Sequence, residues 1–249
     1  MATVNVHFVI PLFNKGKSLR EDVNQLTLFL SPILQDSFEV VLCDDGSTDD
    51  TRRQAEAAAL ANPQVRVMGY AQNKGRGYAI KYAGNNCGGE YLIYLDLDFS
   101  KTTSMQALIR MLEYLREHDV VIGSRFLPDS KTMRLPVRDF VSRVHRFIIR
   151  RLLPGLAITD VDVGFKGIRL SLLKELSGYS QQNRWSWDME LLVLARSRGV
   201  RIKEFAIDWN EKHDGYDSAV DIVRDSIEEF RGIWDVRNRF FLNGKMRRV

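Results

Sequence analysis

Short apolar runs alternate with stretches of helical periodicity along most of the chain. Seven runs rich in β-branched and aromatic residues predict strands over residues 5–12, 38–43, 65–70, 91–95, 119–123, 165–169 and 200–207. Between them, apolar residues recur at three- and four-residue steps, which predicts helices over residues 18–30, 49–61, 77–86, 104–116 and 187–198. This alternation is typical of a mainly parallel sheet with helices on both faces, so we expect an α/β fold.

Polar clusters follow three of the predicted strands. The first strand runs into IPLFNKG, the second into CDDGSTDD and the fourth into DLDFS. In open α/β sheets, ligands bind beyond the carboxyl ends of the strands. We therefore expect the three clusters to converge on one edge of the sheet and to form a binding site there.

The DLDFS cluster places two acids one residue apart, directly after an apolar run. On a strand, Asp96 and Asp98 would share one face about 7 Å apart, and their repulsion would raise both pKa values. A divalent cation relieves that repulsion, and carboxylate oxygens suit Mg²⁺ or Mn²⁺. A solvated strand end is the alternative for this pair alone, but the two neighbouring clusters favour a metal site.

The other clusters also have simpler explanations. DDG is good turn chemistry and STD offers a helix cap, although only one of the two acids leaving the strand can serve as that cap. The stretch NKGRGYAIKYA lacks the third glycine of a dinucleotide fingerprint. It predicts either a plain glycine turn or a loop that brings Lys74 and Arg76 near a phosphate or a sugar.

Composition narrows the classes of function. The chain has 249 residues, 45% hydrophobic and 27% charged, which is ordinary for a soluble domain. The pI of about 9.1 indicates an anionic partner. No apolar run approaches the ~20 residues of a membrane span, no basic leader precedes the first apolar run, and Cys43 and Cys87 have the surroundings of reduced thiols. These features predict a cytoplasmic protein, free or peripheral on the cytoplasmic face of a membrane, and no nucleic-acid-binding motif is present.

For two amphipathic segments, the sequence allows more than one contact partner. RLPVRDFVSRVHRFIIRRLL, residues 134–153, predicts a basic helix that lies on an anionic membrane or packs on the sheet with a solvated basic face. A second helix is expected from about Ala219, and core packing explains its apolar stripe best. Phe240 and Phe241 at its end are candidates to contact a second copy of the chain or a membrane-anchored partner.

Seven motifs, in order and at matching spacing, resemble the family 2 glycosyltransferases of the GT-A fold, above all the dolichyl-phosphate mannose and glucose synthases. The motifs are VIPLFNKGKSL, VLCDDGSTDDT, NKGRGYAIKYA, YLIYLDLDFS, VIGSRF, DVGFKGIR and WDMELLVLARSRGVRIKEFAIDW. They span roughly residues 4–218. The resemblance implies a single GT-A domain with a nucleotide-binding half over about 1–100, an acceptor half over about 101–217, and a C-terminal amphipathic helix and basic tail over 218–249.

The resemblance also implies roles for individual positions. The nucleotide sugar would be bound by Pro11, Phe13, Asn14, Asp44, Asp45, Lys74, Asp96, Leu97 and Asp98. The metal ligands would be Asp96, Asp98 and Ser100. Arg125 and Arg138 would grip the diphosphate or the acceptor phosphate, and Asp160, Asp188 and Glu190 would line the sugar and acceptor side.

Three departures from the family pattern weaken the acceptor assignment more than the donor assignment. Lys15 stands where many relatives have glutamate, and Ser100 stands where lipid-linked synthases carry glutamine. EKHDGYDSA offers Lys212, Gly215 and Ser218 in place of an Arg-x-x-Gly-x-Ser-like run.

We expect a metal-dependent inverting glycosyltransferase that moves a hexose from a GDP-mannose or UDP-glucose type of donor to a polyprenyl or dolichyl phosphate. One alternative keeps the donor but uses a saccharide, protein or small-molecule hydroxyl, for which Asp188, or else Glu190, would be the general base. A lipid phosphate, with a second pKa of about 6, is largely ionised at neutral pH and requires a positive cradle more than a base. A non-catalytic nucleotide-sugar binder is the remaining alternative.

Overall fold

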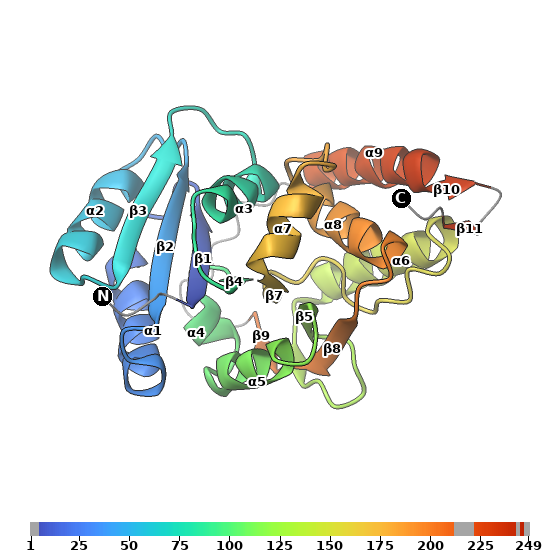
Figure 1. Cartoon of the computed structure of the whole chain (residues 1–249). Coiled ribbons are helices and arrows are strands. Elements are labelled where there is room, and N and C mark those ends of the chain that lie inside the picture. The colour runs from blue at the N-terminus through green and yellow to red at the C-terminus, as the bar shows by residue number, and fades with distance from the viewer. Residues whose placement is uncertain (1–4, 212–221, 243–244, 247–249) are drawn as a thin grey trace.

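The computed structural model describes residues 5–211, 222–242 and 245–246 and is built around a seven-stranded sheet (Figure 1). Its strand order is β3-β2-β1-β4-β7-β5-β8. The strands are β1 (Val6–Leu12), β2 (Phe38–Asp45), β3 (Val65–Tyr70), β4 (Tyr91–Tyr94), β5 (Val120–Ser124), β7 (Lys166–Arg169) and β8 (Ile202–Ala206). All seven predicted strands are therefore present, with ends that differ by at most two residues from those expected.

The sheet is mainly parallel, as predicted. Neighbouring strands β3, β2, β1 and β4 are parallel, β5 and β8 are parallel, and β7 is antiparallel to both β4 and β5. Because β7 alone is reversed among these strands, the carboxyl ends of β1, β2, β4 and β5 lie at the same edge. This arrangement brings together the polar clusters that follow β1, β2 and β4.

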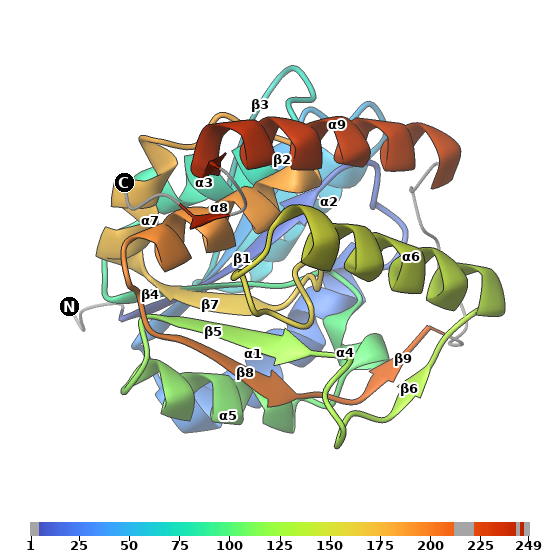
Figure 2. The same cartoon turned by 90° about the vertical axis from the view of Figure 1, so that its right-hand side faces the viewer.

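Helices cover both faces of the sheet. They are α1 (Leu19–Leu34), α2 (Thr51–Ala61), α3 (Arg76–Asn85), α4 (Phe99–Thr102), α5 (Gln106–Leu115), α6 (Pro136–Leu152), α7 (Leu170–Ser177), α8 (Ser186–Ser197) and α9 (Ile222–Phe240). Figure 2 shows α1 and α5 on one face and α3, α7 and α8 on the other, with α6 and α9 beside each other at the outside. The predicted helices are confirmed, although α1 runs four residues past its expected end because it continues through Pro32.

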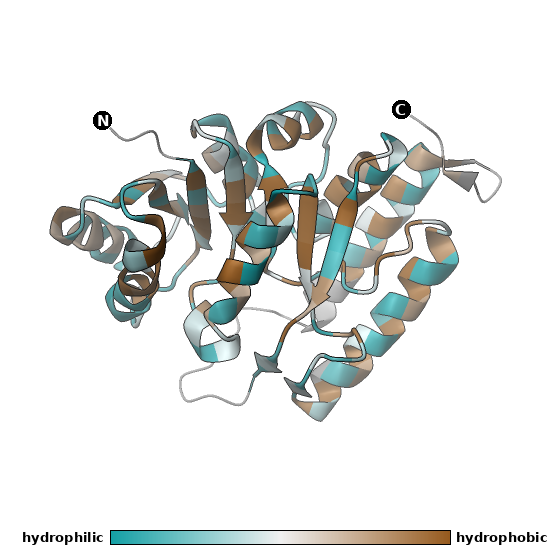
Figure 3. Cartoon of the chain, turned by 60° about the horizontal axis from the view of Figure 1, so that its bottom comes forward, coloured by the Kyte–Doolittle hydropathy of each residue, from teal (hydrophilic) through white to brown (hydrophobic). Residues whose placement is uncertain are grey.

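Burial of apolar side chains explains these elements. The residues of β1 and β2 are almost all buried, as expected for strands covered on both faces, and brown hydrophobic positions concentrate in the central strands (Figure 3). In α5, buried residues recur at helical spacing at Ala107, Leu108, Met111 and Leu115. The core therefore lies between the sheet and the helices that cover it.

Short ladders outside the main sheet fix two loops. β6 (Thr132–Met133) pairs with β9 (Trp209–Asn210), and β10 (Phe241–Leu242) pairs with β11 (Lys245–Met246). The sequence pattern did not predict either ladder, because each strand has only two residues. The β6–β9 ladder brings the loop after β5 beside Trp209.

Candidate active site

The loops after β1 and β2 are joined by hydrogen bonds at the carboxyl edge of the sheet. The backbone N–H of Asn14 donates to Ser47 Oγ at 3.0 Å, and the Asn14 side-chain oxygen accepts from the N–H of Thr48 at 2.9 Å. Asn14 has a φ of 53°, a left-handed conformation that asparagine tolerates better than most residues. Phe13 next to it is exposed at the surface, and Pro11 pairs with Cys43 in the sheet. The first two predicted clusters therefore meet, as expected.

The two acids at the end of β2 have different partners. Asp44 is buried and accepts from the N–H of Ser47 at 3.1 Å. The buried Asp45 carboxylate accepts from the backbone N–H groups of Lys74, at 2.7 Å, and Gly75, at 2.9 Å. It also accepts from the Tyr70 hydroxyl at 2.8 Å. Asp45 thus organises the glycine turn before α3, and a direct contact with the nucleotide stays a prediction.

The glycine turn places two cations beside the site. The Lys74 ammonium lies over the ring of Tyr78, 4.5 Å from its centroid. The Arg76 guanidinium is almost buried and bridges two acids, at 3.3 Å from Asp96 and 2.7 Å from Asp188. Arg76 therefore connects Asp96 of the third cluster to Asp188 of α8, and a contact of Lys74 or Arg76 with a phosphate or a sugar stays a prediction.

The Asp-x-Asp pair lies beyond the strand. We expected both acids on a strand with a shared face, but β4 ends at Tyr94, and Asp98 instead starts the short helix α4. That geometric expectation was wrong because the chain turns immediately after Leu95. Asp96 remains partly exposed, and a Cβ at Gly164 would overlap its carboxylate. The absence of a side chain at position 164 therefore makes room for the Asp96 carboxylate itself.

The rest of the third cluster faces α1. Ser100 Oγ donates to Gln25 at 3.0 Å, so metal binding by Ser100 stays a prediction. Leu97 is partly buried and packs against the core. The fit of a divalent ion rests on the chemistry of Asp96 and Asp98, since two carboxylates with further positions filled by water and phosphate are typical of Mg²⁺ sites.

Asp188 is buried and fully engaged. Its carboxylate accepts from the Lys166 ammonium at 2.6 Å, the Tyr94 hydroxyl at 2.6 Å and Arg76 at 2.7 Å. Burial alone would raise the pKa of Asp188, but Lys166 and Arg76 overcome that effect and lower it. A carboxylate held by two cations and shielded from solvent is a weak general base, so a catalytic role for Asp188 stays a prediction.

Glu190 is buried on the same helix and holds a different part of the structure. It accepts from the Ser180 hydroxyl at 2.6 Å and from the backbone N–H groups of Gln181 and Gln182, and it pairs with Arg239 of α9. These contacts tie the loop before α8 to α9. Glu190 is therefore not brought together with Asp96 or Asp188, and its predicted role on the acceptor side stays a prediction.

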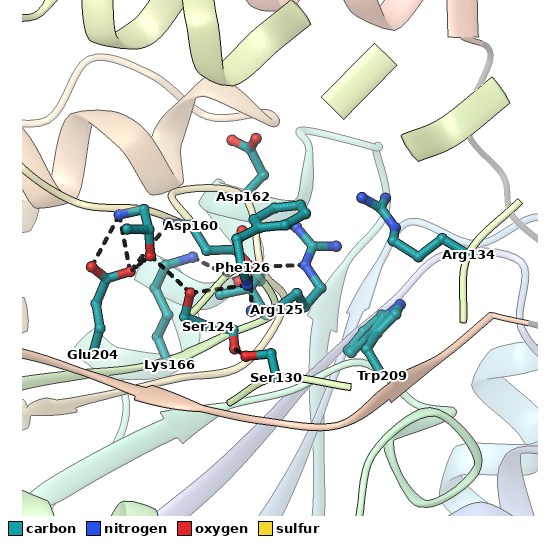
Figure 4. Close-up of polar contacts among 12 residues, drawn as sticks. Ser124, Arg125, Phe126, Ser130, Arg134, Asp160, Asp162, Lys166, Glu204 and Trp209 are labelled. Carbon is teal, nitrogen blue, oxygen red and sulfur yellow. Dashed lines mark hydrogen bonds and ion pairs between the residues drawn. The ribbon is translucent and has the colours of Figure 1, made fainter. Parts of the chain in front are cut away.

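Arg125 and Asp160 form a buried pair on the other side of the edge. Two parallel hydrogen bonds of 2.8 Å join the Arg125 guanidinium to the Asp160 carboxylate, and the Arg125 N–H adds a third at 2.9 Å (Figure 4). Burial opposes ionisation of Asp160, but Arg125 outweighs it and lowers the pKa of that carboxyl. Glu204 of β8 in turn accepts from the backbone N–H of Asp160 at 3.1 Å. Asp160 therefore fixes the direction of Arg125.

Three guanidinium groups surround the ring of Phe126. Arg125 lies 5.4 Å, Arg134 5.5 Å and Arg146 3.6 Å from its centroid. Arg134 is paired with the buried Glu211 at 3.0 Å, whereas Arg146 has no carboxylate partner within the described residues. Burial and the neighbouring arginines lower the pKa of Arg146. Guanidinium groups bind phosphate, so the cluster is a candidate site for an anion.

Some predicted positions fall outside what the structure describes. Arg138 belongs to α6, but its side chain lies outside the described residues, as do Lys212, Gly215 and Ser218.

Sequence reasoning missed the roles of Lys166 and Arg146. Lys166 lies inside the quoted motif DVGFKGIR, and a buried cation for Asp188 could have been suspected because the run LLVLA that follows in α8 has no polar face. Arg146 was counted only as part of a basic helix face. Its stacking on Phe126 is a long-range contact that periodicity does not reveal.

Comparison with known proteins places these features in context. The family model described as glycosyl transferase family 2 matches residues 7–177. A relative named glycosyltransferase AglD, from Haloferax volcanii, is 33% identical over 227 residues; the match covers 90% of this chain but only 35% of that protein, so the chain spans about a third of its length. A dolichyl-phosphate beta-glucosyltransferase from Trichomonas vaginalis is 26% identical over 250 residues, covering 93% of this chain and 74% of the relative.

A solved structure confirms the fold. Glucosyl-3-phosphoglycerate synthase from Mycobacterium tuberculosis, crystallised with Mn²⁺, UDP-glucose and phosphoglyceric acid, superposes with a TM-score of 0.68 at 16% identity, over 94% of this chain and 80% of that one. The GT-A fold expected from the sequence resemblance is therefore confirmed. Within the described part of the chain, no helix is both long and apolar enough to cross a bilayer.

Proposed function

Because the chain belongs to glycosyl transferase family 2, we propose that it transfers a hexose from a nucleotide sugar to a polyprenyl phosphate. The observation that carries the acceptor assignment is the group of arginines around Phe126, close to acids that are already paired. The name of the dolichyl-phosphate glucosyltransferase relative supports the same acceptor class and favours glucose as the sugar.

The donor would bind across the ends of β1, β2 and β4. Phe13 and Asn14 offer a surface for the base and ribose, and Lys74 offers a cation to the phosphates. Asp96 and Asp98 would hold Mg²⁺ or Mn²⁺, which neutralises charge on the departing diphosphate. The Mn²⁺ and UDP-glucose in the mycobacterial structure support this choice of donor and metal.

Arg76 would set the position of Asp96, one of the two acids that would hold the metal. It is held between the buried Asp188 and the partly exposed Asp96, so the buried carboxylate acts on Asp96 through one guanidinium. Asp188 is a positioning residue in this proposal. It replaces the general base expected for a hydroxyl acceptor.

The acceptor phosphate would lie against Arg125 and Arg146. Its oxygen forms a bond to the anomeric carbon of the sugar while the bond from that carbon to the diphosphate breaks, which inverts the configuration. A phosphate ester is mostly ionised at neutral pH, so no proton has to be removed by a side chain. The arginines supply the positive cradle that such an acceptor requires.

A thermal-shift screen tests the donor site. UDP, GDP, dTDP and CDP would each be added with and without Mn²⁺, to the wild type, to Asp98→Asn and to Asp36→Asn, an exposed control on the far side of β2. Ligand at a hundred times its dissociation constant stabilises by about 2.7 kcal/mol, roughly 5–10 °C for a chain of this size. We expect one nucleotide to give this shift only with Mn²⁺, in the wild type and Asp36→Asn but not in Asp98→Asn. Equal shifts in Asp98→Asn would contradict the metal site.

A further inference from the structure

The outer face of α6 exposes an apolar stripe. Val137, Phe140, Val144 and Phe147 recur at helical spacing within an arc of about 80° at 3.6 residues per turn. Their exposed fractions are 63%, 68%, 43% and 69%. The opposite face of the helix packs inward through residues such as Ile149. Helix α6 is therefore apolar on both the packed and the exposed side.

Helix α9 repeats this pattern. Ile233 and Val236 are buried, while Ile227, Phe230 and Trp234, centred about 120° away around the helix axis at 3.6 residues per turn, are 52%, 47% and 48% exposed. Phe230 and Trp234 line an open hollow in the surface. Ile227, Phe230 and Trp234 belong to the stripe that was expected to pack in the core, and their exposure contradicts that expectation for the described part of the stripe.

The two helices lie side by side on one side of the molecule (Figure 2). His145 of α6 joins them, because its ring nitrogens are 2.7 Å from Asp162 and 3.3 Å from Glu229 of α9. Asp162 belongs to the loop between Asp160 and Gly164. The surface formed by α6 and α9 is thus attached directly to the loop that holds Arg125 and borders Asp96.

The charge of α6 indicates what kind of partner binds the surface formed by α6 and α9. This helix carries five arginines and one aspartate, and Arg143, Arg150 and Arg151 are exposed beside the apolar stripe. In a symmetric dimer the same patch meets itself, so two such helices would oppose arginine with arginine. An anionic lipid surface offers phosphates to the arginines and an acyl boundary to the phenylalanines.

We propose that the outer faces of α6 and α9 form a docking surface that lays the chain on an anionic lipid bilayer. This inference rests on the proposed function, because a polyprenyl phosphate is held in a membrane. Arg146 belongs to α6 and stacks on Phe126, so the docked helix borders the arginine cluster. The phosphate of a membrane-resident acceptor then reaches that cluster from the docked side.

Vesicle flotation tests this surface. The chain would be mixed with vesicles of phosphatidylcholine alone or with added phosphatidylglycerol. The test variant is Phe140→Glu/Phe147→Glu, and the matched control is Leu28→Glu/Leu60→Glu, two leucines that are 75% and 91% exposed on α1 and α2. We expect wild type and control to float with anionic vesicles alone, and the test variant to bind them at least about tenfold more weakly. Unchanged melting temperatures would show that all three proteins are folded.

A charge variant tests the second component of binding. Arg150→Glu/Arg151→Glu should weaken flotation as strongly as added salt does, because both remove attraction to anionic headgroups. Flotation that is the same for the phenylalanine variant and the wild type, or equal on vesicles without anionic lipid, would overturn the proposal. So would light scattering that shows a wild-type dimer and a monomeric phenylalanine variant, since the face would then bind a second copy.

Transfer to a short-chain, water-soluble polyprenyl phosphate separates this inference from the proposed function. The phenylalanine variant should keep wild-type turnover with that acceptor while losing turnover with long-chain acceptor in vesicles. Normal flotation without any transfer to the soluble acceptor would refute the proposed function and leave the docking surface standing. Transfer to the soluble acceptor by a wild-type protein that does not float with anionic vesicles would refute the docking surface and leave the proposed function standing.

Discussion

The substitution Asp188→Asn distinguishes a structural anchor from a general base. It keeps the size of the side chain but removes the charge that neutralises Lys166 and Arg76, both of which are almost completely buried. Lys166 would then have no carboxylate partner among the described residues, and Arg76 would keep only the longer contact with Asp96. Breaking a buried ion pair by removing one partner costs about 3–5 kcal/mol.

The pH at which this loss is measured matters. Because the folded-state pKa of Asp188 is lowered, its contribution to stability is fully present above the unfolded value of about 3.9 and is lost as pH falls below it. At neutral pH the full effect should therefore be measured. For a chain of this length, 3–5 kcal/mol corresponds to a fall in melting temperature of roughly 6–20 °C.

Denaturant unfolding of four proteins gives the assay. Wild type, Asp188→Asn, Lys166→Met and the double variant form a double-mutant cycle, with Asp36→Asn as an exposed control expected to stay within about 0.5 kcal/mol. We expect a coupling free energy of about 1 kcal/mol or more between positions 166 and 188. The folded fraction of Asp188→Asn should keep the wild-type shape of its pH–rate profile with a polyprenyl phosphate. An Asp188→Asn protein of wild-type stability that has lost turnover and the acidic limb of that profile would refute the anchor and identify a base.

Three further substitutions test other parts of the site. Gly164→Ala should displace Asp96 and abolish the Mn²⁺-dependent part of the nucleotide thermal shift, because the new Cβ overlaps that carboxylate. Arg125→Lys should raise the KM for polyprenyl phosphate at least about tenfold with little change in the donor KM, since lysine lacks the fork that fits both Asp160 and a phosphate. Against the effect of burial, Asp162 and Glu229 raise the pKa of His145 to about 9, against about 6.5 in the unfolded chain. The protonated ring therefore stabilises the fold fully below pH 6.5, and this contribution is lost as pH rises through 9. Between pH 6.5 and 10 the free energy of unfolding of the wild type should fall by about 3 kcal/mol more than that of His145→Gln.

Matched controls accompany these substitutions. Gly88→Ala adds a methyl group that meets no atom within 4 Å, so the nucleotide thermal shift should be unchanged. Arg53→Lys on the exposed face of α2 should leave both KM values unaltered. His7, whose pKa is also raised to about 9, is present in both proteins that are compared for His145. A control that behaves like its test variant would contradict the corresponding prediction.

Local sequence patterns predicted most of the strands and helices of the fold. The strands and helices follow from runs and periodicities within short windows, and the convergence of the three polar clusters follows from a parallel sheet. The direction of β7 could not be predicted, since whether a strand runs parallel or antiparallel depends on neighbours far away in sequence. Asp96 and Asp98 were found as a pair, but their placement in a turn depends on where β4 stops.

The partners of the predicted site residues could mostly not be predicted from the sequence. Asp188 pairs with Lys166 and with Arg76, which is 112 positions away along the chain. Asp160 meets Arg125 across 35 positions. A pattern indicates which positions carry charge, whereas the identity of a charge's partner is decided by tertiary packing. For this reason the sequence indicated the acids Asp160 and Asp188 but not the cations that hold them.

Transfer from labelled UDP-glucose to two acceptors of equal chain length, a polyprenyl phosphate and the corresponding polyprenol, tests the central claim most directly. With Mn²⁺ present, glucose should appear on the phosphate-bearing lipid and not on the alcohol, because the arginines around Phe126 would bind the phosphate and Asp188, the expected base, is held by Lys166. Glucosylated polyprenol alongside an unmodified polyprenyl phosphate would contradict it.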